Sequence, residues 1–410
     1  MSPPLNNDKR PSWRSLPKNV WAVGATSFLT DISSEMVINI LPLFLSNVLG
    51  VRTNIIGIIE GVAEATASLL KVFSGWLSDK LRQRKWITVI GYGISALSKP
   101  FFYFAATWEA IAAVRWADRV GKGVRTAPRD ALVADSTDER LRGLAFGIHR
   151  AADTAGAVVG LAIALLIIWF AQAQNTLLTR NTFQIIVLVS LLPAFLAILT
   201  LILGTQDVPV TKQRDMPKFA FRKLGKPFMF LMLITVVFYL GNSSDAFLIL
   251  RAQERGLSVV SVMGMLIVFN LIYTLVSVPF GALSDRIGRK NIIIGGWLLY
   301  ALVYFGFAFA QEVWHVWVLY SIYGLYYGLT YGITKALIAD IVAPELSGTA
   351  FGTYSAVVGI INFPASLIAG ILWQGWGNWT GLGAAAPFLF GGMLALLASF
   401  MMLFWKLPQS

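Results

Sequence analysis

The 410-residue chain contains no cysteine and only two histidines, His149 and His315. Without cysteine it has no disulfide bond, no thiol nucleophile and no thiolate metal site, and two histidines cannot build a multi-histidine metal centre. Charged residues are also scarce, at 13% of the chain, against about 25% in a soluble domain. These shortages exclude a soluble enzyme, a disordered chain and a nucleic-acid-binding domain, and no cofactor is expected.

Apolar residues are correspondingly abundant. They make up 56% of the chain, whose mean hydropathy is +0.67, and apolar runs recur from Trp21 to Trp405. A helix that crosses a membrane needs about 20 such residues, so the length accommodates an all-α membrane protein with twelve transmembrane helices. We expect these helices at roughly 20–46, 55–77, 86–106, 109–134, 143–170, 183–204, 227–250, 259–283, 291–311, 313–338, 348–375 and 385–405.

The basic residues are divided unevenly between the two sets of loops. Twenty lysines and arginines fall on the side that carries both termini, and four fall on the opposite side. By the positive-inside rule, both termini are predicted to lie in the cytoplasm. The net charge of +12 is then mostly a signal of topology in the membrane. The expected partner is the lipid bilayer and not nucleic acid.

The two halves of the chain resemble each other. The segments 131–135 (ALVAD) and 141–147 (LRGLAFG) recur 205 residues later as 336–340 (ALIAD) and 346–352 (LSGTAFG), and 75–80 (GWLSDK) recurs at 281–286 (GALSDR). Two similar halves around a shared centre are what an alternating-access transporter requires. We expect a disordered cytoplasmic tail at 1–18, pseudo-symmetric six-helix halves at 19–204 and 227–406, and a cytoplasmic linker at 205–226.

One repeated segment carries a resemblance to a known family. The segment 281–290 (GALSDRIGRK) is similar to the signature that the major facilitator superfamily has between helices 8 and 9, and Arg115 resembles the family's helix-4 arginine. In the first-half copy, Lys80 replaces an arginine and Arg82 stands in place of the second glycine. The resemblance covers essentially the whole chain. It implies a secondary active transporter rather than an enzyme, monomeric, in the cytoplasmic (inner) membrane.

The repeated signature places a carboxylate at the cytoplasmic end of a helix in each half, Asp79 and Asp285. Such a carboxylate can accept hydrogen bonds from a neighbouring helix N-terminus and pair with arginine. We interpret the pair as a latch of the outward-facing state; the alternative is that both residues only mark a turn. The predicted gate and latch residues are Asp79, Lys80, Arg129, Asp130, Asp135, Asp285, Arg286 and Asp340.

Many charges lie inside the predicted spans, where each costs at least ~2.5 kcal/mol. On helix 4 they recur at steps of three or four and form one stripe, which is either an anion-binding wall or part of an internal salt-bridge network. Eight positive and seven negative charges in the first half favour pairing for most of them. The resemblance implies that helices 1, 4, 7 and 10 line the cavity. The predicted substrate-binding residues are Arg115, Arg119, Lys122, Arg125, Asp245, Tyr327, Tyr331 and Lys335.

Carboxylates one turn apart are candidates for proton coupling. Asp31 and Glu35 have this spacing, as do Glu60 and Glu64, and neighbouring like charges disfavour double ionisation. His149 and Asp153 are also four residues apart. For His149 the alternative is a hydrogen-bonded interior residue. The predicted proton-coupling residues are Asp31, Glu35, Glu64, His149 and Asp153.

The predicted helix 10 offers tyrosines where helix 4 offers charges. Five tyrosines between 320 and 331 form an aromatic face interrupted by glycines. They either line the cavity or pack between helices, which the glycines allow to approach closely. An aromatic wall opposite a charged wall suits an organic ion with an apolar body.

These patterns predict a proton-coupled transporter of a small organic anion or zwitterion. An alternative is an efflux antiporter for amphipathic drugs, although Leu161 follows Gly160 where the antiporters of the superfamily have proline. A second alternative is a non-transporting receptor on the same fold.

Overall fold

The computed structural model describes residues 13–172, 175–208, 224–343 and 346–405. Most of the predicted linker, 209–223, and residues 1–12 of the predicted tail lie outside this part of the chain. The end of the predicted tail is structured. Trp13–Ser15 forms a 3-10 turn, and the Trp13 ring packs edge-on against Trp21 with centroids 6.3 Å apart.

The described residues form twelve membrane-length helical rods, which confirms the predicted fold. Three rods are interrupted and nine are continuous. The first-half helices are α1 (Lys18–Ile38), α2 (Leu41–Leu43), the π-helical η2 (Phe44–Val48), α3 (Thr53–Leu81), α4 (Lys85–Ser98), α5 (Pro100–Phe104), α6 (Trp108–Ser136), α7 (Arg142–Gln172) and α8 (Arg180–Gly204). Those of the second half are α9 (Gly225–Gly241), α10 (Ala246–Glu254), α11 (Val259–Ile287), α12 (Arg289–Phe309), α13 (Val313–Ile341), α14 (Ser347–Gln374) and α15 (Ala386–Phe404).

Eight of these rods are apolar enough to be recognised as membrane spans by composition. The remaining four are α3, α4 with α5, α6 and α13. Among them, α3 and α6 carry the paired charges described below, and α13 carries the tyrosines. The helices least like ordinary spans are therefore those that supply much of the site.

Two helices break at equivalent positions of the two halves. The first rod breaks after α1 at Asn39 and Ile40, next to Pro42, which has no N–H to continue the hydrogen-bond ladder. The seventh rod breaks between α9 and α10 at 242–245, where asparagine, two serines and aspartate compete for backbone hydrogen bonds. Adding the repeat offset of 206 to Asn39 gives Asp245. The breaks therefore lie on either side of the pseudo-symmetry axis and expose polar backbone there.

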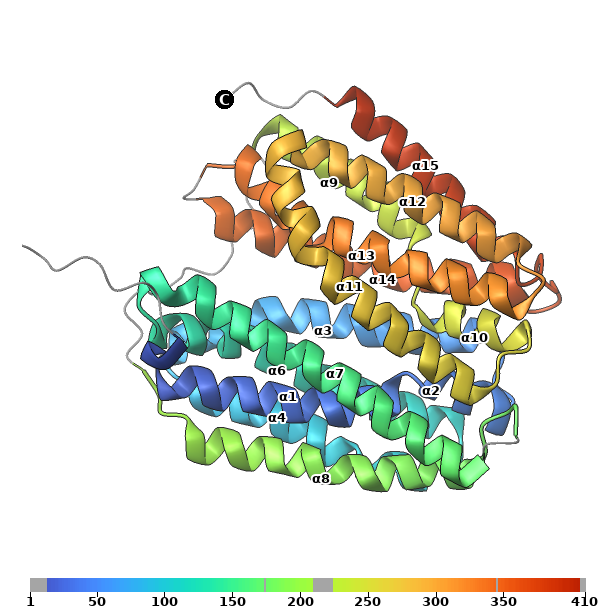
Figure 1. Ribbon diagram of the computed structural model, residues 1–410, viewed down its shortest axis with the longest axis horizontal. Helices are drawn as coiled ribbons and strands as arrows, with labels where there is room; N and C mark the ends of the chain where they lie inside the picture. Colours follow the sequence, from blue (N-terminus) through green and yellow to red (C-terminus); the bar gives the residue numbers. More distant parts are fainter. Residues whose placement is uncertain (1–12, 173–174, 209–223, 344–345, 406–410) are drawn as a thin grey trace, which may run out of the picture.

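The two halves lie side by side, with α3 against α14 and α7 against α11 across their boundary. We call the end where α1 begins and α15 ends the terminal end, and the other the distal end. In Figure 1 the first half lies below the second, and their ribbons spread apart toward the terminal end.

A tight turn follows α3 and recurs after α11. Arg82 has φ 54° and ψ 30°, and Gly288, its counterpart 206 residues later, has φ 92°. Arg82 is the one non-glycine residue with positive φ among those described. The two turns differ in ψ, which is 30° at Arg82 and 132° at Gly288. The first half therefore turns through the left-handed helical region without a glycine, at a cost of about 1–2 kcal/mol for an L-residue in this conformation.

We expect Arg82→Gly to stabilise the protein by about 0.5–1 kcal/mol, because glycine adopts positive φ without strain but loses more backbone entropy on folding. The measurement is thermal unfolding of the purified protein in detergent. Gly288→Ala is the matched reverse change and should destabilise. If Arg82→Gly left the protein unchanged or weakened it, the conformation of Arg82 would not be strained.

Candidate functional site

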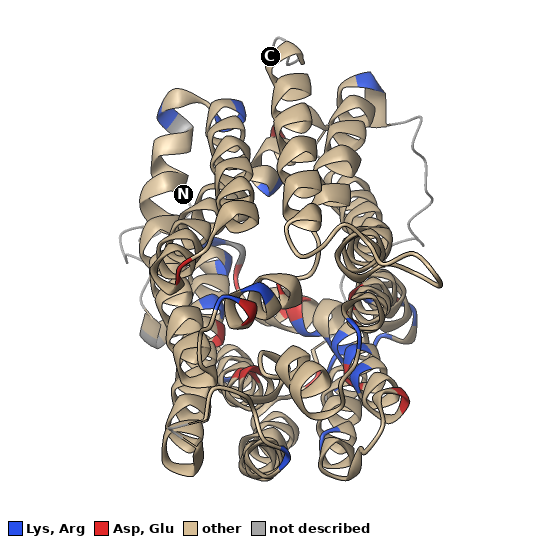
Figure 2. Ribbon diagram, turned by 90° about the vertical axis from the view of Figure 1, so that its right-hand side faces the viewer, with Lys and Arg blue, Asp and Glu red and all other residues tan. Residues whose placement is uncertain are grey.

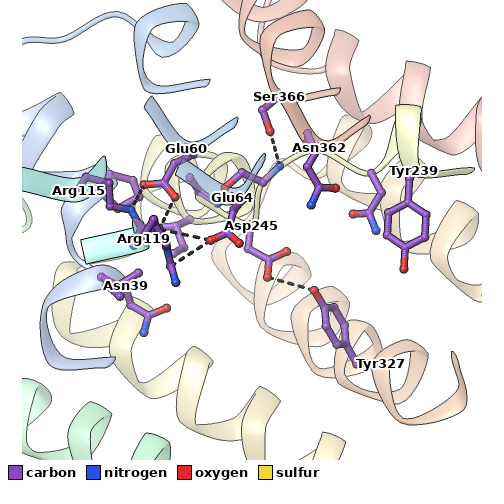
Figure 3. Close-up of a pocket in the computed structure, with 17 residues that line it drawn as sticks. Asn39, Glu60, Glu64, Arg115, Arg119, Tyr239, Asp245, Tyr327, Asn362 and Ser366 are labelled. Carbon is purple, nitrogen blue, oxygen red and sulfur yellow. Dashed lines mark hydrogen bonds and ion pairs between the residues drawn. The ribbon is translucent and has the colours of Figure 1, made fainter. Parts of the chain in front are cut away.

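A cavity of about 330 Å³ lies between the two halves, at the level of the two helix breaks. Its walls come from α1, α3 and α6 on one side and from α9, α10, α13 and α14 on the other. Figure 3 shows the polar side chains of both halves pointing into this space. Five lining residues carry charge, and they are Glu60, Glu64, Arg115, Arg119 and Asp245.

The first-half wall is a chain of ion pairs between α3 and α6. The Arg115 guanidinium donates to both oxygens of Glu60, with Nη2–Oε2 2.6 Å and Nε–Oε1 3.2 Å. One turn on, Arg119 Nη2 lies 3.0 Å from Glu64 Oε1. The spacing of four residues on both helices aligns the two pairs. The stripe on helix 4 is thus partly neutralised here, as the near-balance of charges in the sequence indicated.

Each of these two arginines has one nitrogen without a hydrogen-bond partner among the described residues. The two nitrogens are Arg115 Nη1 and Arg119 Nε, and both are buried. Unsatisfied buried donors cost about 1–3 kcal/mol each, more when charged. Asp118 Oδ2 lies 3.7 Å from Arg115 Nη1 and offsets part of its charge. Because both nitrogens are buried, a ligand reaches them only if these side chains move.

The second-half wall centres on Asp245, at the start of α10. Its two oxygens accept hydrogen bonds from Tyr323 (2.8 Å) and Tyr327 (3.3 Å) of α13. Nearby, the Ser244 backbone N–H donates to Ser366 of α14 (3.2 Å). The carboxylate of Asp245 has neutral hydrogen-bond donors but no ion-pair partner within 4 Å in the described part of the chain.

Uncharged polar residues complete the lining, and most escaped the sequence prediction. Asn39 connects the cavity to the predicted proton carrier Glu35, because its Nδ2 donates a hydrogen bond to Glu35 Oε2 at 2.7 Å. The polar run at 242–245 inside an apolar span was the available signal for a helix break. The other uncharged polar residues missed were Tyr239, Asn242, Ser243, Ser244, Asn362 and Ser366. The charged residue Glu60 was also not among the predicted site residues.

Four predicted substrate-binding residues do not line this cavity. Arg125 is buried inside the first half, where it donates to Ser95 Oγ (2.6 Å) and stacks over Tyr92. Lys122, Tyr331 and Lys335 are exposed and lie closer to the terminal end. Helical spacing explains the difference, since each sits one or two turns beyond a cavity residue on α6 or α13.

The predicted proton-coupling residues are placed in two groups. Glu64 lines the cavity, while Asp31 and Glu35 lie half-buried on α1. His149 is buried, with its ring 2.9 Å from Ser27 Oγ and 3.7 Å from Asp153. His149 is thus hydrogen-bonded in the interior of the first half, away from the cavity lining.

The predicted latch residues repeat one arrangement in both halves. Arg84 pairs with Asp79 and with Asp135 (3.2 Å), and Arg289 pairs with Asp340 (2.5 Å) at the equivalent positions. Lys85 donates to carbonyls at the end of α8, and Lys290 does the same for α15. A lysine at a helix C-terminus also interacts favourably with the helix dipole.

These pairs join helices within a half, not across the boundary. Arg129 likewise pairs with its neighbour Asp130 (2.9 Å), and Lys80 lies over the Trp76 ring. Arg286 is exposed, and the side chain of Asp285 lies outside the described part of the structure. The interhalf latch is not formed by Asp79 in this state.

Contacts between the halves gather at the distal end instead. The side-chain amides of Asn47 and Gln253 exchange hydrogen bonds of 2.7 and 2.8 Å. Arg52 and Thr53 bind Gln374, and Asn54 donates to the Gly375 carbonyl (2.9 Å). The distal end is therefore closed by polar contacts that a rocking motion would have to break.

Glycines let α3 and α14 approach closely beside these contacts. A Cβ at Gly57 would collide with the Ser366 carbonyl oxygen, whereas a Cβ at Gly93 of α4 would meet nothing within 4 Å. We expect Gly57→Ala to disfavour the closed distal end by about 1–3 kcal/mol, the usual cost of overpacking.

The measurement is the yield of an oxidative cross-link between Asn47→Cys and Gln253→Cys, in a chain that has no other cysteine. Gly57→Ala should lower the yield, and Gly93→Ala should not. Equal yields in the two variants would show that α3 and α14 do not set the closure.

Comparisons with known proteins agree with this architecture. The family model described as Major Facilitator Superfamily matches residues 23–269 and 231–410. An uncharacterised MFS-type transporter of Methanocaldococcus jannaschii is 35% identical over 397 residues, which cover 95% of this chain and 96% of that protein.

Solved structures share the fold at low sequence identity. The nucleoside transporter NupG is 14% identical with a TM-score of 0.77, and the match covers 94% of this chain and 99% of that one. An inward-facing, occupied bacterial homologue of the human lysosomal transporter Spinster is 16% identical with a TM-score of 0.75, covering 97% of each chain. The chain accordingly belongs to the major facilitator superfamily and is a multi-pass membrane transporter.

Proposed function

We propose that the protein moves a small zwitterion across the cytoplasmic membrane by alternating access, coupled to proton movement. The observation that carries the proposal is the pair of opposite charges facing one cavity from two halves. Among the described residues, Arg119 Nε on the first-half wall has no hydrogen-bond partner, and Asp245 on the second-half wall has no ion-pair partner within 4 Å. Figure 3 shows both side chains directed into the same space.

A zwitterion satisfies both walls at once. Its carboxylate would accept bonds from Arg119, which can bind carboxylates with two parallel N–H groups. Its ammonium group would donate to Asp245, whose carboxylate forms hydrogen bonds with Tyr323 and Tyr327 and no ion pair within the described part of the chain. Binding to both walls links the halves through the substrate, as alternating access around a central site requires.

The charge balance of the lining disfavours the other substrate classes. Three carboxylates against two arginines leave one excess negative charge, which opposes a simple anion. The asparagines and serines around Asp245 give the cavity little of the apolar surface that binding of an amphipathic drug relies on.

Glu64 and Arg119 offer a way to couple protons to the substrate. A substrate carboxylate that binds Arg119 competes with Glu64 for the same guanidinium. A carboxylate that loses its positive partner binds a proton more readily, so substrate binding at Arg119 would favour protonation of Glu64. Glu35, which accepts from the cavity residue Asn39, is a second acceptor for that proton.

The closed distal end indicates which side of the membrane the cavity faces in this state. If the excess of basic loop residues lies in the cytoplasm, the state described here is open to the cytoplasm and closed to the outside. Substrate would then leave to the cytoplasm or enter from it in this state.

The test is proton movement in proteoliposomes that contain a trapped pH dye. A panel of zwitterions, simple anions and lipophilic cations is added under an imposed pH gradient. Zwitterions should drive proton flux, and Glu64→Gln should leave zwitterion uptake without proton flux. Proton flux driven by lipophilic cations alone, in the opposite direction, would replace this proposal with the efflux antiporter.

A further inference from the structure

A second group of charges lies between the cavity and the terminal end. Two cations from different halves approach one aromatic ring, that of Tyr331 on α13. The Arg150 guanidinium of α7 lies 5.3 Å from the ring centroid, and Lys335 Nζ lies 5.1 Å from it. Arg150 also donates to the Tyr273 hydroxyl of α11 at 2.5 Å. We call this group the vestibule cluster.

Two more lysines act on the same phenol. Lys71 of α3 and Lys122 of α6 both interact electrostatically with Tyr331. The vestibule cluster thus contains four cations, three from the first half and one from the second. It is defined by Lys71, Lys122, Arg150, Tyr273, Tyr331 and Lys335.

The helices place this cluster apart from the central cavity. On α13, Tyr331 and Lys335 follow the cavity residue Tyr327 by one and two turns, and on α6, Lys122 follows Arg119 by one. At 1.5 Å per residue these steps displace the cluster by about 5–12 Å toward the terminal end. Lys122, Arg150, Tyr331 and Lys335 are all exposed, so water reaches them in this state.

Nearby acids do not balance the cluster. Asp130 interacts with Lys71 but forms its ion pair with Arg129, and Asp153 faces both Arg150 and His149. Glu64 also acts on Lys122 but pairs with Arg119, and Asp31 acts on Lys122 as well. Counting Arg119 and Arg129, six cations stand against the four carboxylates of Asp31, Glu64, Asp130 and Asp153. Closing the terminal end would bring the like charges of the two halves nearer, and repulsion at reduced dielectric opposes that step.

We propose that the vestibule cluster binds a doubly charged oxyanion, a phosphate or a dicarboxylate, held between Arg150 of the first half and Lys335 of the second. The planar guanidinium supplies paired donors for an oxyanion. The ammonium group of Lys335 supplies the opposing charge from the other half. An anion bound here contacts both halves and offsets the repulsion between their cations. The zwitterion proposed for the central cavity lies nearer the distal end and does not reach these cations.

The experiment measures binding of inorganic phosphate and of succinate to the full-length protein in a neutral detergent, by calorimetry at constant ionic strength. We expect saturable binding of at least one of the two. Removing one cation should weaken it roughly fivefold, and removing two should weaken it more than tenfold. The variants are Lys335→Gln, Arg150→Gln and their combination.

Lys18→Gln is the matched control, because Lys18 is an exposed lysine of the terminal end, at the start of α1. It should bind the anions as the wild type does. The proposal is overturned if neither anion binds saturably, or if Lys18→Gln weakens binding as much as Lys335→Gln. A zwitterion-transport assay that fails leaves this result unaffected, since the binding experiment contains no zwitterion.

Discussion

Asp245→Asn should abolish substrate binding and transport while the protein still folds. The amide keeps the shape of the side chain, and its oxygen still accepts a hydrogen bond from Tyr323 or Tyr327. It removes the negative charge that would hold the ammonium group. Losing one partner of a desolvated charge pair costs about 2–5 kcal/mol, which weakens binding by a factor of roughly 30 or more. Uptake of a zwitterion into proteoliposomes and its direct binding in detergent are the measurements.

Tyr327→Phe provides the comparison for this variant. It removes one 3.3 Å hydrogen bond to Asp245 and leaves the charge, so a loss of only a few fold is expected. If Asp245→Asn bound the zwitterion as tightly as wild type, the second-half wall would not recognise the ammonium group. The proposed substrate class would then be wrong, although the transporter fold would stand.

Arg115→Met should produce the largest loss of stability. The side chains of Arg115 and Glu60 are 2% and 6% exposed and form a two-point ion pair. Removing the arginine leaves Glu60 buried with an uncompensated charge, and breaking such a pair costs about 3–5 kcal/mol. Thermal unfolding in detergent measures the loss. The double variant Glu60→Gln, Arg115→Gln should recover much of it, because neither charge then remains buried.

Arg289→Met is the matched control for the ion pair. Its partner Asp340 is half exposed, and the Arg289 side chain is 28% exposed. Solvent screening reduces the value of such a pair to about 0–1 kcal/mol. Equal losses for Arg115→Met and Arg289→Met would contradict the claim that the ion pair of the cavity wall is desolvated.

The sequence was sufficient to predict the fold because apolar length and the internal repeat are direct physical requirements of it. Spans such as those at Arg180–Gly204 and Ala386–Phe404 are long and apolar enough to cross a membrane. The breaks at Asn39 and 242–245 were not predicted. They depend on a few local polar residues and a proline within helices whose overall composition is that of ordinary spans.

The candidate site was predicted in part. Arg115 and Arg119 were predicted from helical periodicity, Glu64 as a proton carrier, and Asp245 and Tyr327 as residues of helices that the family resemblance places around the cavity. All five line one cavity. Periodicity identifies a face but not the depth at which that face meets the other half, so Lys122, Tyr331 and Lys335 were assigned to the same site as Arg119. The role of Glu60 depends on how α3 packs against α6, and that of Ser366 on how α14 meets the break before α10. No spacing within one helix reveals either contact.

The most direct test of alternating access is a pair of distance measurements on spin-labelled protein in lipid nanodiscs. The chain has no cysteine, so spin labels attach only to the cysteines that are introduced. The distal end is labelled at Asn47→Cys with Gln253→Cys. The terminal end is labelled at Lys80→Cys with Arg286→Cys. Across a pH range, with and without the zwitterion that drives proton flux, the distal distance should lengthen as the terminal distance shortens. One fixed distance at each end under every condition would contradict the account.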